Sequence, residues 1–94
     1  MNDTSKLIGE NGCVFLDNSV TNEDVYMIHV LEDSVFTVLN EASTKGGSET
    51  NVLTTMNLSG KTVKAGAILT PYNEVFSDIS ISSGSCMLYK LGRW

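Results

Sequence analysis

Few residues in this chain have side chains suited to chemistry, and the sole histidine, His29, is the first to consider. His29 lies within an apolar run at residues 25–31. A general base needs a nucleophile and an orienting group within reach. A zinc site needs further ligands at compatible spacing. The sequence supplies neither arrangement, so we interpret His29 as a structural residue of the core or the surface.

The two cysteines, Cys13 and Cys86, also lie in apolar segments, far apart in the sequence. A thiol in such a segment usually acts as a small hydrophobe. A catalytic cysteine needs an electropositive neighbourhood, which neither segment offers. We therefore expect two buried thiols. Whether they are bridged depends on whether the fold brings their Cα atoms within about 7 Å.

The remaining candidates for chemistry are carboxylates and glycines. Most of the 11 acidic residues lie in expected turns, and none follows the spacing of a calcium-binding loop. Gly46-Gly47 and Gly66 lack both the spacing and the following helix of a phosphate loop. We therefore expect no catalytic residue, no cofactor and no metal within the chain, so that the protein is not an enzyme. A weak divalent-ion site between subunits stays open.

Apolar residues near the two ends of the chain are the candidate binding residues. Trp94 is the C-terminal residue and has no local partners in sequence. It either folds back on its own domain or anchors in a neighbour, since tryptophan is enriched at interface hot spots. Leu7 and Ile8 interrupt an otherwise polar N-terminal segment and can anchor it on a neighbour. The candidate interface therefore consists of Leu7, Ile8 and Trp94.

The charge of the chain argues against two classes of partner. The net charge is −5, and the six basic residues are scattered rather than clustered. Nucleic-acid binding needs a basic footprint that neutralises phosphates, and anionic membranes repel an acidic surface. No signal-peptide pattern opens the chain, and no apolar run approaches the roughly 20 residues of a membrane helix. We expect synthesis in a cytoplasm, where free thiols are stable.

Ninety-four residues predict one domain, with a flexible arm at residues 1–11 and the domain at 12–94. A chain of this size buries about two-thirds of its unfolded surface, so its core is thin. Small domains usually gain stability from disulfides, metals or oligomerisation. Because the first two are not evident, oligomerisation is the expected source.

The order of apolar runs and turns predicts an all-β protein. Expected strands lie at residues 13–16, 25–31, 34–39, 51–58, 62–64, 67–69, 75–82 and 86–91. A helix over 25–31, capped from residues 21–24, is the alternative reading of that run. Loops are expected at 17–24 and 40–50, a hairpin turn at 83–85, and a positive φ at Gly66. About seven to eight short strands predict a small antiparallel sandwich or barrel-like domain.

A skeleton of short motifs runs from Asp33 to Tyr89, more than half of the chain. It consists of Asp33-Ser34-Val35-Phe36-Thr37, then Val63-Lys64-Ala65-Gly66-Ala67-Ile68, then Phe76-x-x-Ile79-x-Ile81-x-Ser83-Gly84, and a closing Tyr89. This pattern resembles the head-decoration, or cement, proteins of tailed bacteriophages and the short trimeric virion proteins related to them. The resemblance implies a β-rich homotrimer, made in the host cytoplasm, that binds the major capsid protein on the virion surface and stabilises the particle.

Two other functions remain open at this stage. A fibre, baseplate or tail-attachment component shares the fold expectation and differs in its place on the particle. A carbohydrate- or ligand-binding β module belongs to another class, and such sites usually gather exposed aromatic residues. The tyrosines and the tryptophan are instead spread along the chain, at Tyr26, Tyr72, Tyr89 and Trp94.

Overall fold

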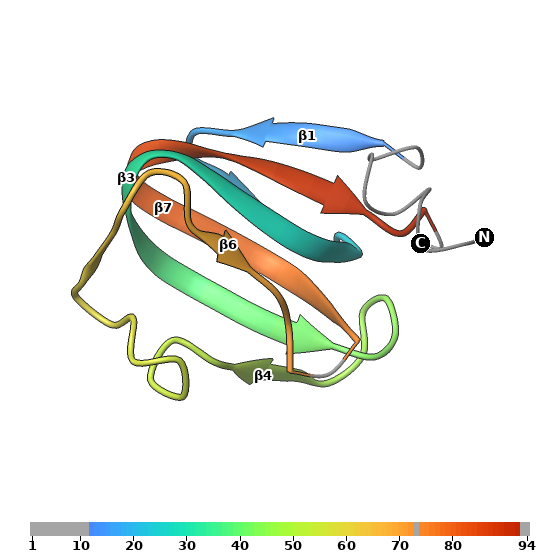
Figure 1. Ribbon diagram of the computed structural model, residues 1–94. Helices are drawn as coiled ribbons and strands as arrows, with labels where there is room; N and C mark the ends of the chain where they lie inside the picture. Colours follow the sequence, from blue (N-terminus) through green and yellow to red (C-terminus); the bar gives the residue numbers. More distant parts are fainter. Residues whose placement is uncertain (1–11, 73, 93–94) are drawn as a thin grey trace.

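A computed structural model describes residues 12–72 and 74–92, and within these ranges the chain is all-β (Figure 1). The described residues contain no helix, and hence none that could cross a membrane. The predicted fold class is confirmed, and the helical alternative for residues 25–31 is wrong. The described residues form seven strands: β1 (Cys13–Leu16), β2 (Ser19–Val20), β3 (Val25–Ala42), β4 (Glu49–Asn51), β5 (Thr62–Val63), β6 (Ile68–Leu69) and β7 (Val75–Lys90).

Two long strands, β3 and β7, form the framework of the domain. They pair antiparallel along their whole length, from Val25 opposite Lys90 to Ala42 opposite Val75. The sequence predicted two short strands in place of each. The predicted break in β3 was Glu32-Asp33, and the predicted break in β7 was a hairpin turn at 83–85. Those two breaks instead lie opposite each other, where the ladder shifts register and both strands bend (Figure 1). The hairpin turn was therefore a wrong prediction, because the break is a bend of two paired strands.

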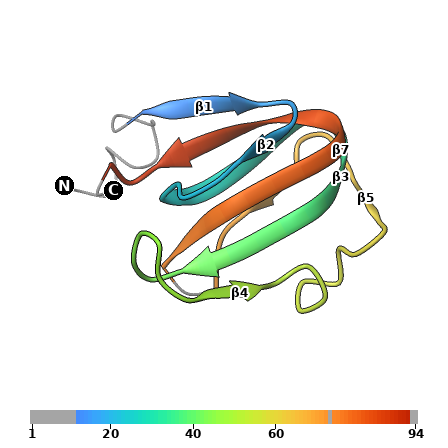
Figure 2. The ribbon, with the colours of Figure 1, turned by 180° about the vertical axis from the view of Figure 1, so that it is seen from behind.

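The bend divides one continuous sheet into two halves that fold over each other. The first half-sheet consists of β1, the C-terminal half of β7, the N-terminal half of β3, and β6. The second half-sheet consists of β2, the N-terminal half of β7, the C-terminal half of β3, and β4 (Figure 2). β5 pairs with β3 at the bend itself. Val25 lies opposite both Lys90 and Phe76, so the start of β3 contacts both halves.

The hydrophobic core lies between the two half-sheets. Alternate residues of the long strands point inward, as the period of a strand requires. The largest buried apolar side chains are Phe36, Phe76, Leu16, Ile28, Leu39, Ile79 and Leu88. The inward positions of both halves therefore meet in a single cluster, which is the core that the alternation around Ile79 and Ile81 predicted.

The chain between β4 and β5 departs from the predicted strand at residues 51–58. Successive turns replace the strand: Met56 N donates to Val52 O at 2.9 Å, and Leu58 N donates to Leu53 O at 2.8 Å. The neighbours Val52 and Leu53 are both buried, which a period-2 strand does not allow. The apolar residues that alternate in the sequence of this segment lie on several sides of a series of turns. The short strand β2, within the expected loop at 17–24, was also missed.

Polar residues at the bend connect the motifs of the sequence skeleton. Ser34 is fully buried, and its Oγ donates to the Glu32 carbonyl at 2.7 Å. The Asp33 carboxylate accepts the Ala65 N–H at 2.9 Å and the Lys64 ammonium at 3.3 Å. Gly66 has a φ of +94°, which confirms its predicted conformation. The skeleton residues around positions 33, 64 and 84 therefore build this bend.

The Asp33 contacts make stability dependent on acid. The hydrogen bond from the Ala65 N–H, followed by that from Lys64, holds the pKa of Asp33 below its ordinary value. A carboxyl group with a lowered pKa stabilises the fold above its unfolded pKa of about 3.9, and this stability is lost as the pH falls through the lower, folded pKa. We expect the urea midpoint of Asp33→Asn to fall less than that of the wild type between pH 7 and pH 3. Equal falls for the two proteins would contradict this assignment.

Candidate docking face

The outer face of the first half-sheet is unusually apolar. Residues directly opposite each other in an antiparallel ladder project their side chains to the same face. One cross-strand row therefore runs from Phe15 through Met87 and His29 to Ile68, and a second runs from Cys13 through Tyr89 to Met27. Leu31 extends this face along β3. We call these residues the docking face: Cys13, Phe15, Met27, His29, Leu31, Ile68, Met87 and Tyr89.

Several of these side chains are exposed although they are large and apolar. Phe15 is 55% exposed, Ile68 59% and Leu31 39%, and Cys13 is exposed as well. The docking face contains no Asp, Glu, Lys or Arg. Single exposed apolar residues are normal in folded proteins, but a contiguous patch of them marks an interaction site. These residues therefore form the candidate binding surface within the described part of the chain.

The outer face of the second half-sheet is the internal comparison. Its cross-strand rows are Ser19–Ser80–Val38 and Asp78–Asn40–Asn51. Asn40 Nδ2 donates to Asp78 Oδ2 at 3.3 Å, and the Asn22 N–H donates to Asp78 Oδ1 at 3.0 Å. This face consists largely of polar side chains, as expected of a solvated sheet surface. The contrast between the halves shows which side of the molecule is suited to an apolar partner.

The end of the docking face near the start of β3 carries fixed aromatic and charged groups. The rings of Tyr26 and Tyr89 lie 6.5 Å apart between centroids, at 48° to each other. Burial, followed by the proximity of Tyr89, raises the pKa of Tyr26. Nearby, Lys90 Nζ lies 2.7 Å from Glu23 Oε1, and this hydrogen bond raises the pKa of Lys90. The aromatic pair therefore includes Tyr89 of the docking face, and the ion pair involves Lys90, the next residue along β7.

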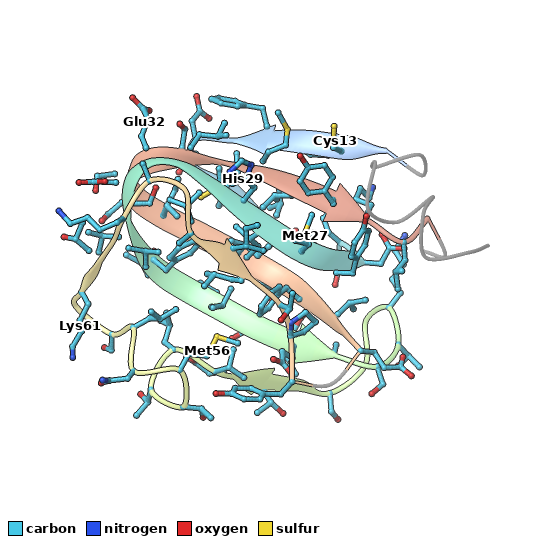
Figure 3. All side chains as sticks on the ribbon, viewed as in Figure 1. Cys13, Met27, His29, Glu32, Met56 and Lys61 are labelled. Atoms are coloured by element: carbon cyan, nitrogen blue, oxygen red, sulfur yellow. The ribbon has the colours of Figure 1, made fainter. Side chains whose placement is uncertain are left out.

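His29 lies within the docking face, half-buried between Met87 and Ile68 on its neighbouring strands. Figure 3 shows it with Cys13 and Met27 on the strands of the first half-sheet. Within residues 12–72 and 74–92, no group of three His, Cys, Asp or Glu side chains is arranged to hold a metal ion. His29 is therefore a polar side chain within a largely apolar face.

The cysteines differ from the expectation of two buried thiols. Cys86 is buried, and burial raises the pKa of its thiol. Its sulfur lies 3.8 Å from the Ser34 hydroxyl at the bend. Cys13 is exposed on the docking face, so that part of the expectation is wrong. Both thiols are free, which answers the open question of a bridge between them.

The interface residues predicted from the sequence, Leu7, Ile8 and Trp94, lie outside the described residues. The docking face itself was missed, although the sequence carries a signal for it. The segments of β1, the first part of β3 and the last part of β7 are continuous apolar runs. Such runs are typical of strands covered on both faces. Here one face of each is covered by the core, and the other forms the docking face.

Comparison with known proteins adds no relative from which a function can be transferred. No family model, no curated protein and no solved structure matches this chain.

Proposed function

We propose that this chain is a structural binding protein that docks through its apolar face on a larger assembly, and that this assembly is the capsid of a tailed bacteriophage. The observation that carries the docking role is the charge-free outer face of the first half-sheet, beside a polar outer face on the second. The choice of a capsid is supported by the resemblance of the sequence skeleton to head-decoration proteins. In this role the protein is made in the host cytoplasm and resides on the virion surface.

The proposed mechanism is cementing by burial of apolar surface. Removing apolar surface from water contributes about 25 cal/mol per Å². Phe15, Leu31 and Ile68 expose such surface on three different strands. When this face lies across the junction of two capsid subunits, the protein contacts both subunits and holds them together. The flexible thioethers of Met27 and Met87 help the face adapt to its partner, because methionine fills irregular gaps.

The distribution of aromatic residues favours protein docking over a glycan site. Among the described residues, the exposed aromatic rings are Phe15, in β1, and Tyr72, which precedes β7. Phe15 belongs to the edge strand of the first half-sheet, whereas Tyr72 binds the C-terminal end of β3 through its N–H, which donates to Glu41 Oε2 at 2.8 Å. They therefore form no shared stacking platform of the kind that sugar-binding sites use.

Copy number in purified particles tests the proposal. Because decoration proteins follow the symmetry of the whole shell, we expect hundreds of copies per particle by quantitative mass spectrometry. About a dozen copies would place the protein in a fibre, baseplate or tail attachment instead. Particles that lack the protein should lose their contents at lower temperature than complete ones. Equal heat stability of the two kinds of particle would refute the cementing role.

A further inference from the structure

The outer edge of β1 carries backbone groups that have no partner strand among the described residues. β1 pairs with β7 on one side, and within the described ranges no strand pairs with its other side. Lys90 N donates to Gly12 O at 3.0 Å. Because alternate residues of an antiparallel strand bond to the same neighbour, Val14 and Leu16 also bond toward β7. Cys13 and Phe15 therefore direct their N–H and C=O groups outward.

Within Cys13–Leu16 this edge lacks three of the features that prevent strands from pairing. Cys13–Leu16 contains no charge and no proline, and its ladder with β7 shows no bulge. Soluble proteins usually protect an edge with one of these features. An uncharged edge with outward-pointing donors and acceptors is therefore a template for another strand.

Charge and length indicate which strand that is. Two copies of a chain with net charge −5 repel each other where their carboxylates meet. The edge of β4 carries the exposed Glu49, whereas β1 carries no charge. β2 and β6 are uncharged as well, but each has two residues, against four in β1. β1 is therefore the longest described edge at which two copies can meet without facing like charges.

We propose that β1 pairs antiparallel with β1 of a second copy, with Cys13 of each copy opposite Phe15 of the other. In this register both outward-pointing residues of one strand bond to both outward-pointing residues of the other. A two-fold axis then passes between the two Val14 residues, which face each other as a closely spaced, non-hydrogen-bonded pair. Registers shifted by two residues in either direction leave part of this set of hydrogen bonds unmade within β1.

The dimer has a consequence for the docking face. Opposite residues lie on the same face of a ladder, so Cys13 and Phe15 of both copies stay on one side. The two docking faces thus join into one apolar surface across the two-fold axis. This inference does not depend on the capsid, and it predicts a dimer rather than the trimer that the phage resemblance implies.

Sedimentation equilibrium of the full chain tests the pairing. We expect a dimer for the wild type and for Phe15→Ala, which keeps the outward N–H. Phe15→Pro removes that N–H from each copy without touching a bond to β7, because proline is tolerated on the free side of an edge strand. We expect it to weaken dimerisation by roughly 100-fold. A monomeric or trimeric wild type, or a Phe15→Pro variant that dimerises as well as the wild type, would overturn the proposal.

Disulfide trapping tests the register and covers the case in which Phe15→Pro fails to fold. In Phe15→Cys, the introduced thiol of one copy lies opposite Cys13 of the other, at a Cα separation of about 5.5 Å that a disulfide can span. Mild oxidation should therefore give a covalent dimer. Leu31→Cys, with the same number of thiols and an exposed cysteine away from the edge, should stay uncrosslinked. Absence of the Phe15→Cys dimer, or equal crosslinking of both variants, would contradict the register.

Discussion

Gly84→Ala is expected to lower the free energy of unfolding by about 3 kcal/mol. Gly84 has a φ of +91°, and an added Cβ would overlap Ser34 Oγ and lie 2.5 Å from the Asp33 carbonyl oxygen and 2.8 Å from Ser34 Cα. Two of these three atoms belong to the backbone, so no rotamer change relieves the overlap. The two long strands would have to separate at the bend, where the half-sheets fold over each other. Urea unfolding followed by circular dichroism measures the loss.

Gly66→Ala is the control that separates two costs of Gly84→Ala, the left-handed backbone conformation and the steric overlap. Gly66 has a nearly identical φ of +94°, but an added Cβ there meets no atom within 4 Å. Its substitution should therefore cost only the left-handed backbone conformation, about 1 kcal/mol. If the two variants lost the same stability, close packing at the bend would not be the reason for glycine at position 84.

Ile68→Asp is expected to weaken binding to the proposed particle by about 100-fold or more. Ile68 is 59% exposed and lies at the β6 end of the row through His29 and Met87. A carboxylate there would be buried unpaired in an apolar contact, which costs several kcal/mol. The free protein should keep its stability to within about 0.5 kcal/mol, since the substituted position is exposed. Co-sedimentation with particles that lack the protein gives the affinity.

Ser19→Asp is the matched control for this loss of binding. Ser19 is exposed and lies opposite Ser80 on the polar outer face of the second half-sheet. The substitution adds the same charge to the same protein on the other side of the core. It should bind particles as the wild type does. A similar loss for both variants would indicate a general effect of negative charge rather than a specific docking face.

Local patterns in the sequence predicted most of the fold. The apolar run at Cys13–Leu16 became a strand with those bounds, and alternation around Ile79 and Ile81 identified inward positions that are buried. The breaks at Glu32-Asp33 and 83–85 were located correctly, but the first was interpreted as the end of a strand and the second as a hairpin turn. Whether a polar, glycine-containing break is a turn or a bend depends on the strand paired with it. Here the breaks lie opposite each other in the β3–β7 ladder, and no local pattern contains that information.

The docking face was harder to predict because it depends on the order of strands in space. Phe15, His29 and Ile68 are far apart in the chain and belong to three different strands. Only the register of those strands with β7 and β3 places them in one row. The continuous apolar runs indicated that both faces of these strands avoid water, without indicating which face the core covers. The sequence therefore indicated binding residues only near the chain ends, at Leu7, Ile8 and Trp94, which lie outside the described residues.

Thiol footprinting on assembled particles tests the docking face most directly. In a Cys13→Ala background, Ile68→Cys places a reactive thiol on the docking face, and Ser19→Cys places one on the polar face, while Cys86 stays buried in both. Both introduced thiols should react rapidly with iodoacetamide in the free proteins. On the particle we expect the thiol at position 68 to become protected and the thiol at position 19 to stay reactive. Equal reactivity of the position-68 thiol in the free and particle-bound protein would contradict docking through this face.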